Sequence, residues 1–101
     1  MSVSKRYLKT RPVCKVTFRV DSEAAGASED VRLVGDFNGW DAEACPMTRL
    51  KSGDFSATLD LEPGREYQFR YLMDGVAWEN DWAADAYAPS GYGSDNSVVT
   101  V

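Results

Sequence analysis

The chain has 101 residues, a net charge of −5 and no histidine. This length predicts one domain, and the acidic balance excludes a nucleic-acid binder, which needs a basic face to displace counterions. Without histidine, a Ser/His/Asp or Cys/His catalytic site and a Cys/His zinc site are excluded, and the sequence indicates neither a metal nor a cofactor.

The chain begins with a basic segment, residues 1–12, which we expect to precede the domain as a solvated arm. Its charge comes from Lys5, Arg6, Lys9 and Arg11, with no acidic residue among them, and a binding arm is the less favoured alternative. The segment has no apolar stretch typical of a signal peptide. No apolar run approaches the ~20 residues of a membrane helix, so a cytoplasmic location is expected.

Alternation of apolar and polar residues predicts short strands along the rest of the chain, residues 13–101. The expected strands are Val13–Val20, Val31–Gly35, Asp54–Leu61, Glu66–Met73, a short strand ending near Trp78, and Ser97–Val101. Loops are expected at Asp21–Asp30 and at Asn80–Ser97, the second with one helical turn at Ala83–Ala86. Short strands with turn signals between them and no long helix predict a single antiparallel, immunoglobulin-like β-sandwich.

The inward positions of these strands predict the core. It is expected to contain Phe18, Leu33, Phe55, Leu59, Tyr67 and Phe69. Cys14 also lies at an inward position, so it is expected to be a small buried hydrophobe. A disulfide between Cys14 and Cys45 is disfavoured in a reducing cytosol.

A tryptophan follows an Asn-Gly turn at the end of an apolar strand, in the segment Gly35–Trp40. The Asn38-Gly39 pair turns the backbone sharply and puts Trp40 on a loop. There its flat indole would be a platform for the apolar face of a sugar ring. Alternatively, Trp40 folds inward and plugs the end of the core. The loop by itself favours neither interpretation.

Carboxylates are frequent after Trp78, but their spacing does not indicate catalysis. Glu79, Asp81 and Asp85 would have to supply the acid pair of a glycosidase, whereas loop acids are more often simply solvated. The stretch Asn80–Asn96 lacks the regular ligand spacing of a calcium loop. The chain is therefore expected to be neither an enzyme nor a metal binder.

Aromatic residues interleaved with polar ones form the most informative set in the chain. This set is Trp40, Arg70, Trp78, Trp82, Tyr92 and Asn96. Sugar-binding surfaces need such a mixture, because aromatic planes stack under ring faces while Asn and Arg side chains bond hydroxyls. An exposed aromatic face is equally what a protein interface needs.

Three motifs, in this order and spacing, resemble the glycogen- and starch-binding module of the isoamylase N-terminal (early set) type. They are Val34–Trp40, Phe69–Gly75 followed by Trp78, and Gly93–Val99, and the resemblance covers roughly residues 13–101. Relatives of this type precede the catalytic barrels of branching and debranching enzymes and occur in the β subunit of AMP-activated protein kinase. The resemblance implies a β-sandwich and non-catalytic binding of glycogen, starch or maltodextrin.

The resemblance also implies roles for particular residues. Trp40 and Trp78 would be the two stacking platforms, and Asn96 matches an asparagine that binds sugar hydroxyls. Arg70 stands where the kinase module has a lysine, which changes the donor geometry. The two remaining matches, a small hydroxyl residue and an apolar residue that inserts beside the sugar, are Ser94 and Tyr92.

The position of Trp78 depends on the loop that joins its short strand to the preceding one. The Asp74-Gly75 pair by itself favours a two-residue turn. That turn would set Trp78 opposite Tyr71 on the buried face, because a slip of one residue reverses the face of every side chain.

A three-residue loop that ends at Val76 instead sets Trp78 opposite Leu72, on the face of Arg70. The resemblance requires this second register. We therefore predict the three-residue loop and expect Trp40, Arg70 and Trp78 to share one exposed surface.

The expected ligand is accordingly an α-1,4-linked glucan, and the resemblance implies glycogen-metabolising enzymes as further partners. The alternative comes from another class: a protein–protein interaction or dimerisation module without sugar affinity. Neither nucleic acid nor membrane is an expected partner, and the sequence leaves the oligomeric state open.

Overall fold

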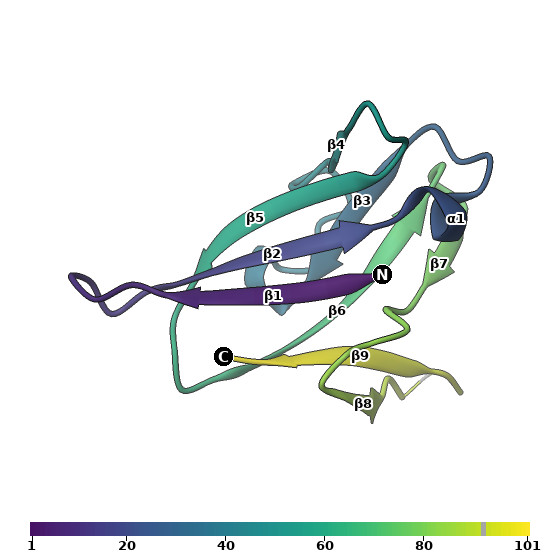
Figure 1. Ribbon diagram of the computed structural model, residues 1–101. Coiled ribbons are helices and arrows are strands. Elements are labelled where there is room, and N and C mark those ends of the chain that lie inside the picture. The colour runs from purple at the N-terminus through teal and green to yellow at the C-terminus, as the bar shows by residue number, and fades with distance from the viewer. Residues whose placement is uncertain (92) are drawn as a thin grey trace.

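The computed structural model describes residues 1–91 and 93–101, and it contains two antiparallel sheets packed face to face (Figure 1). The strands are β1 (Ser2–Tyr7), β2 (Cys14–Val20), β3 (Val31–Gly35), β4 (Thr48–Arg49), β5 (Phe55–Leu61), β6 (Glu66–Met73), β7 (Ala77–Glu79), β8 (Ala86–Pro89) and β9 (Asp95–Thr100). A one-turn helix, α1 (Ser22–Ala25), and a 3-10 turn, η1 (Asp36–Asn38), complete the regular structure of these residues. The predicted antiparallel β-sandwich is confirmed.

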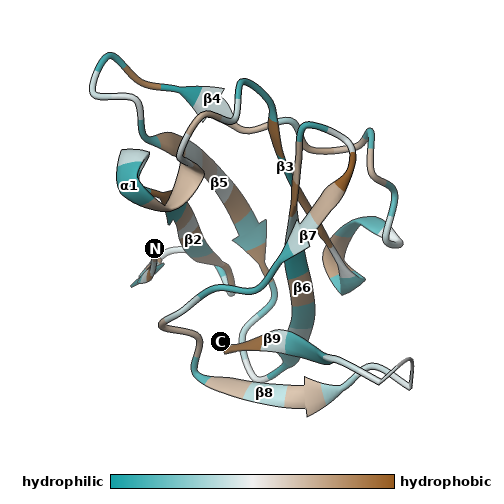
Figure 2. Ribbon diagram, turned by 90° about the vertical axis from the view of Figure 1, so that its right-hand side faces the viewer, coloured by the Kyte–Doolittle hydropathy of each residue, from teal (hydrophilic) through white to brown (hydrophobic). Residues whose placement is uncertain are grey.

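The strand order is β1-β2-β5-β4 in the first sheet and β3-β6-β9-β8 in the second. The central strand of the second sheet is β6, and β3 pairs with one of its edges. Along the other edge β9 and β7 follow one another, beside Glu66–Phe69 and Tyr71–Met73 respectively (Figure 2). Strands β3, β7 and β9, which are far apart in the chain, therefore all pair with β6.

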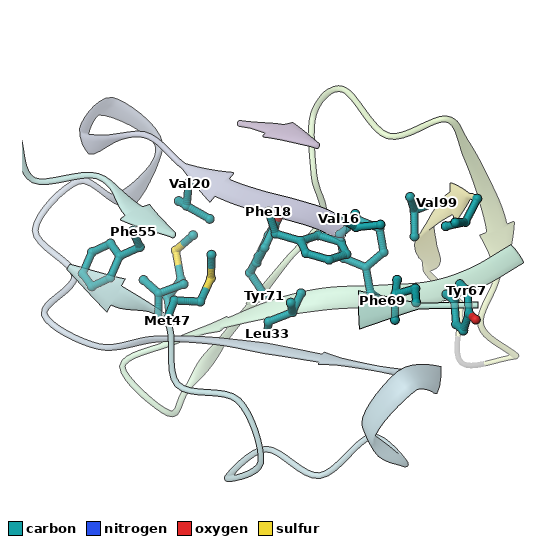
Figure 3. Packing of buried hydrophobic residues seen from close by; sticks show 14 of the residues in the cluster. Val16, Phe18, Val20, Leu33, Met47, Phe55, Tyr67, Phe69, Tyr71 and Val99 are labelled. Atoms are coloured by element: carbon teal, nitrogen blue, oxygen red, sulfur yellow. The ribbon is translucent and has the colours of Figure 1, made fainter. Parts of the chain in front are cut away.

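The core lies between the inner faces of the two sheets, where aromatic rings from both sheets meet (Figure 3). The Phe69 ring centroid lies 5.1 Å from that of Phe18 and 5.7 Å from that of Tyr71, in the edge-on arrangement that aromatic pairs favour. The predicted core residues that are buried are Phe18, Leu33, Phe55, Tyr67 and Phe69. For these five residues, the core position predicted from the alternation of apolar and polar residues is confirmed.

Leu59, which was also predicted to be in the core, packs against the core cluster but is only half-buried. Its strand, β5, pairs with β2 along one edge, but the two-residue β4 covers only Phe55 and Ser56 on the other edge. Leu59 thus points toward the core and packs against it at an open margin of the first sheet, where no further strand covers it among the described residues.

The basic N-terminal segment, residues 1–12, is not the solvated tail that the sequence predicted. Ser2–Tyr7 pair with β2 along the whole of β1, which makes β1 the edge strand of the first sheet. Val3 packs against the core, and Lys5 Nζ donates to Asp85 Oδ2 at 2.6 Å, just before β8 of the other sheet. Val3 and Lys5 alternate as a strand requires, but that signal is short and the surrounding positive charges obscure it.

One helical turn is present, but not where the sequence predicted it. α1 lies inside the expected loop Asp21–Asp30, and Asp21 caps it by accepting a hydrogen bond from the Ala24 amide at 2.8 Å. At the predicted turn, Ala83–Ala86, the chain enters β8 instead. There the Ala83 amide donates to the side chain of Asp81 at 2.8 Å, a local bond that competes with helix formation.

Both cysteines are free, and Cys14 is buried as expected. Cys45 is half-buried, and this burial raises the pKa of its thiol. Neither helical turn among residues 1–91 and 93–101 is long and apolar enough to cross a membrane.

Candidate functional site

The loop after β3 carries Phe37 into the core and leaves Trp40 outside it. The Asn38 side chain accepts from the Gly35 amide at 3.1 Å and donates to the Leu33 carbonyl at 3.0 Å, which closes the turn. Phe37 packs against the core cluster, whereas Trp40 is 36% exposed. Phe37, rather than Trp40, therefore plugs this end of the core.

Trp40 has a backbone conformation that few bulky residues adopt. Gly39 and Trp40 are both left-handed, with φ angles of 64° and 59°, and for a bulky side chain this costs about 1–3 kcal/mol. The Trp40 amide donates to the Gly35 carbonyl at 2.9 Å. Its indole Nε1 donates to Asp36 Oδ1, also at 2.9 Å, so both the backbone and the ring of Trp40 are held.

Trp78 lies on the outward face of the second sheet, as the three-residue loop predicts. Met73 pairs with Ala77 and Leu72 pairs with Trp78, which confirms the predicted register. Asp74 and Gly75 take the positive φ angles that this turn requires. Asp74 Oδ1 also accepts hydrogen bonds from two backbone amides of the loop before β3, which stabilises the turn. The Trp78 side chain is 47% exposed.

Arg70 occupies the middle of this face and is held by neutral oxygens. Its Nε donates to Asn96 Oδ1 at 2.7 Å, and its Nη2 donates to Ser94 Oγ at 2.6 Å and to the Asp95 carbonyl at 2.7 Å. No carboxylate within 4.0 Å pairs with Arg70 among the described residues. Among residues 1–91 and 93–101, therefore, no carboxylate neutralises this charge and Nη1 donates no hydrogen bond, so both of its N–H groups can donate to a ligand.

A chain of hydrogen bonds joins Arg70 to Trp40 across the outward face. Asn96 donates from Nδ2 to Gln68 Oε1 at 3.0 Å, and the Gln68 amide donates to Asp36 Oδ2 at 2.7 Å. The other oxygen of Asp36 accepts from the Trp40 indole. Asp36 and Gln68 were not predicted as part of the site, because nothing in the sequence brings the loop after β3 beside β6.

These side chains surround an open hollow with a volume of about 430 Å³. Its lining residues are Trp40, Arg70, Trp78, Ser90, Ser94 and Asn96. Five of the six residues predicted for the site therefore lie together, and the sixth, Tyr92, lies outside the described residues. Sequence reasoning missed Ser90, which reaches the hollow because its amide donates to the Ser94 carbonyl at 2.9 Å and closes the turn between β8 and β9.

Apolar side chains also lie on this outward face, which alternation predicted to be polar. Leu72 is buried because Arg32 and Trp78 flank it directly on the neighbouring strands. Val34 pairs with Arg70 and is fully buried. Leu72 and Val34 are not among the residues that line the hollow, whose apolar surface comes from Trp40 and Trp78.

The carboxylates that follow Trp78 do not face the hollow. Asp81 is fully buried and accepts from the Tyr71 hydroxyl at 2.8 Å; burial, reinforced by the adjacent Asp81, raises the pKa of Tyr71 well above its usual value. Asp85 pairs with Lys5 instead. Asp81 and Asp85 therefore form contacts between segments of the fold. In residues 1–91 and 93–101, no group of three or more Asp, Glu or Cys side chains could hold a metal ion.

Trp82 is the most exposed tryptophan of the chain, with 64% of its surface accessible. Sequence reasoning grouped it with the exposed aromatic set, but it does not line the hollow. Tyr87 holds the loop beside it, because the Tyr87 hydroxyl donates to the Asp81 carbonyl at 2.6 Å.

Comparison with known proteins gives a family for most of the chain. The family described as Carbohydrate-binding module 48 (Isoamylase N-terminal domain) matches residues 8–88. The match includes Trp40, Arg70 and Trp78, and it ends before Ser94 and Asn96.

Three similar proteins are much longer than this chain. Protein FLOURY ENDOSPERM 6, chloroplastic, of Oryza sativa subsp. japonica is 36% identical over 74 residues, which are 73% of this chain and 13% of that protein. The 1,4-alpha-glucan branching enzyme GlgB of Photobacterium profundum is 34% identical over 92 residues, 88% of this chain and 12% of the enzyme. Protein PTST, chloroplastic, of Arabidopsis thaliana is 35% identical over 80 residues, 75% of this chain and 27% of that protein. The chain thus spans only a small part of each relative that it matches.

Proposed function

The chain belongs to the carbohydrate-binding module 48 family, the isoamylase N-terminal domain, and we propose that it binds α-glucan without catalysing a reaction on it. The ligand would be an α-1,4-linked chain, as in glycogen, starch or maltodextrin. The observation that carries this proposal is the hollow in which two exposed tryptophans flank an arginine whose charge has no carboxylate partner among the described residues.

The two tryptophans suit the apolar faces of glucose rings. Trp40 comes from the loop after β3 and Trp78 from strand β7, but both line the same hollow, and each keeps a large exposed fraction. A glucose ring presents C–H groups on its face, and burying these against an indole removes apolar surface from water on both sides.

The polar residues of the hollow suit sugar hydroxyls. Within the described part of the chain, Arg70 Nη1 keeps two N–H donors, and Asn96 keeps one of its two Nδ2 hydrogens after bonding Gln68. Ser94 Oγ is exposed, accepts from Arg70 and lies 3.4 Å from Ser90 Oγ, so these two hydroxyl groups form a polar wall that a sugar hydroxyl can approach. Charge-assisted bonds from an arginine to neutral oxygens are stronger than bonds between neutral groups.

We propose that the affinity is weak, with Kd on the order of 10 μM to 1 mM, or about −4 to −7 kcal/mol. The hollow is open, and a flexible glucan loses conformational entropy when it is ordered there. In the whole protein, glycogen-metabolising enzymes as partners and a cytoplasmic location stay predictions.

Native gel electrophoresis with and without glycogen in the matrix tests the proposal. The wild-type protein is expected to be retarded by glycogen, and Trp40→Ala and Trp78→Ala to lose that retardation. Trp82→Ala is the matched control, since it also removes an exposed tryptophan but does not touch the hollow. Unchanged mobility of the wild type in glycogen would reject glucan binding in favour of a protein interface.

A further inference from the structure

We propose that Asp36 is the positioning residue of the site: it fixes the plane of the Trp40 indole and couples that plane to the donors of Arg70 and Asn96. This inference rests on the proposed glucan binding. Asp36 does not line the hollow, so it is expected to act through Trp40 rather than by touching the ligand.

Both carboxylate oxygens of Asp36 have a specific donor. Oδ1 accepts from the Trp40 indole Nε1 at 2.9 Å, and Oδ2 accepts from the Gln68 amide at 2.7 Å. The Gln68 amide belongs to β6, the central strand of the second sheet, so the carboxylate is tied to a rigid part of the fold. Asp36 has no cationic partner within 4.0 Å among residues 1–91 and 93–101. Its two oxygens therefore serve these two donors.

The Trp40 ring needs this support because the surrounding protein covers it incompletely. Trp40 stands on a loop with a left-handed backbone and is 36% exposed. Without the Nε1 bond, the ring could rotate about its side-chain torsions while the backbone stayed in place. A ring that is already oriented loses less conformational entropy when a ligand stacks on it.

The same carboxylate also connects two walls of the hollow. Gln68 accepts from Asn96 through its side chain at 3.0 Å, and Asn96 in turn accepts from Arg70 Nε at 2.7 Å. A stacking platform and the hydroxyl donors are thus linked through one residue, so their spacing is fixed before a glucan arrives.

Two-dimensional ¹⁵N spectra of the tryptophan indoles and maltoheptaose titrations test the proposal on the same samples. Asp36→Ala is expected to shift the Trp40 Nε1–H resonance, to speed its exchange with water, and to raise Kd for maltoheptaose about five- to tenfold. Asp36→Asn keeps one side-chain acceptor but turns its Nδ2 hydrogens toward the other donor, so it is expected to give a resonance and an affinity between those of Asp36→Ala and the wild type. Asp41→Ala is the matched control, since it removes a carboxylate of the same loop whose side chain bonds the Glu43 amide instead; it is expected to change neither readout.

A double-mutant cycle separates positioning from a general effect on the loop. Phenylalanine at position 40 keeps an aromatic ring but has no indole N–H, so Asp36→Ala in the Trp40→Phe background is expected to change Kd less than about twofold. An equal loss of affinity in both backgrounds, or an unchanged Trp40 resonance in Asp36→Ala, would overturn the proposal. If the wild-type protein binds no maltoheptaose, the proposed function is rejected, and the indole resonance alone decides whether Asp36 orients Trp40.

Discussion

The outward faces of the two sheets differ in how their charges are satisfied. On the first sheet, Lys15 pairs with Asp60 directly across the strands at 2.9 Å, and Arg19 pairs with Asp54 at 2.6 Å. On the second sheet, Arg70 bonds neutral oxygens and pairs with the fully buried Val34 of the neighbouring strand. Lys15 and Arg19 of the first face thus have carboxylate partners, whereas Arg70 of the second face has none among the described residues and lies beside exposed rings. The comparison teaches that an arginine without a carboxylate partner, together with exposed rings, distinguishes the face proposed to bind glucan from the face whose cations form ion pairs.

The largest expected effect comes from a residue that lies between the sheets and supports both faces. Phe69 is fully buried and its ring meets Phe18 and Tyr71. Phe69→Ala is expected to lower the free energy of unfolding by about 3–5 kcal/mol, because it removes buried surface and leaves a cavity. Urea denaturation followed by circular dichroism measures this change. A loss below about 1 kcal/mol would mean that the core does not pack as described.

Removal of one ring from the second face is expected to abolish its function without unfolding the domain. Trp78→Ala is expected to cost about 2 kcal/mol or more of binding free energy, at least about a thirtyfold loss in affinity for maltoheptaose. The melting temperature should stay nearly unchanged, because Trp78 is half-exposed. Isothermal titration calorimetry and thermal melts measure the two quantities. If the variant unfolds as Phe69→Ala does, Trp78 is a structural residue and the site is wrongly assigned.

A conservative change at Arg70 sharpens the comparison by keeping the charge and changing only the donor geometry. Lysine cannot reach Asn96, Ser94 and the Asp95 carbonyl together as the guanidinium does. Arg70→Lys is therefore expected to lower glucan affinity about tenfold, or about 1.4 kcal/mol, with little effect on unfolding. The same maltoheptaose titration measures it, and wild-type affinity in this variant would show that charge alone is sufficient.

The two sheets also meet at an ion pair whose contribution depends on pH. Partial burial by itself would raise the pKa of Asp85, but the hydrogen bonds from Lys5 and from the Thr100 amide outweigh it and hold the pKa below its usual value. The native state therefore binds fewer protons at this group than the unfolded state does. The stabilisation is present above about pH 4 and is lost as the pH falls through the native pKa.

Denaturation of Asp85→Asn at pH 7 and pH 3 checks this dependence. The variant is expected to be less stable than the wild type by under about 1 kcal/mol at pH 7, since the pair is partly exposed. The difference should shrink at pH 3. A difference that grows in acid would contradict the sign of the pKa change.

The smallest effect is expected on the first outward face. Lys15→Met breaks the pair with Asp60, but both side chains are more than 40% exposed, and such pairs contribute about 0–0.5 kcal/mol. Neither unfolding nor glucan binding should change measurably. Altered maltoheptaose affinity in Lys15→Met would mean that binding is not confined to the second sheet.

Six of the strands were predictable from sequence because apolar and polar residues alternate along them, whereas β1, β4 and β8 were not expected. The register after Met73 was predicted from the family resemblance instead: the Asp-Gly pair by itself favoured a two-residue loop, and the three-residue loop that the resemblance requires is the one observed. The register in turn put Trp78 beside Arg70, on the face where both line the hollow.

The parts that could not be predicted depend on contacts between distant segments. Asp36 reaches Gln68 only because β3 pairs with β6, and β1 was obscured because its inward Lys5 finds its partner, Asp85, 80 residues away. Leu72 is buried on an outward face because Trp78 and Arg32 flank it from neighbouring strands. The alternation of apolar and polar residues predicts on which face of a sheet a side chain lies, but it does not predict which other side chains bury it there.

The left-handed backbone at Trp40 sets folding and binding against each other at a single position. Glycine or asparagine would suit a φ of 59° better than tryptophan does, whereas the hollow needs an aromatic ring there. Directed evolution for thermal stability alone would therefore be expected to replace Trp40 early and to produce a more robust domain that no longer binds. Stability and activity trade off here within one residue, so a library screened for stability should hold position 40 fixed.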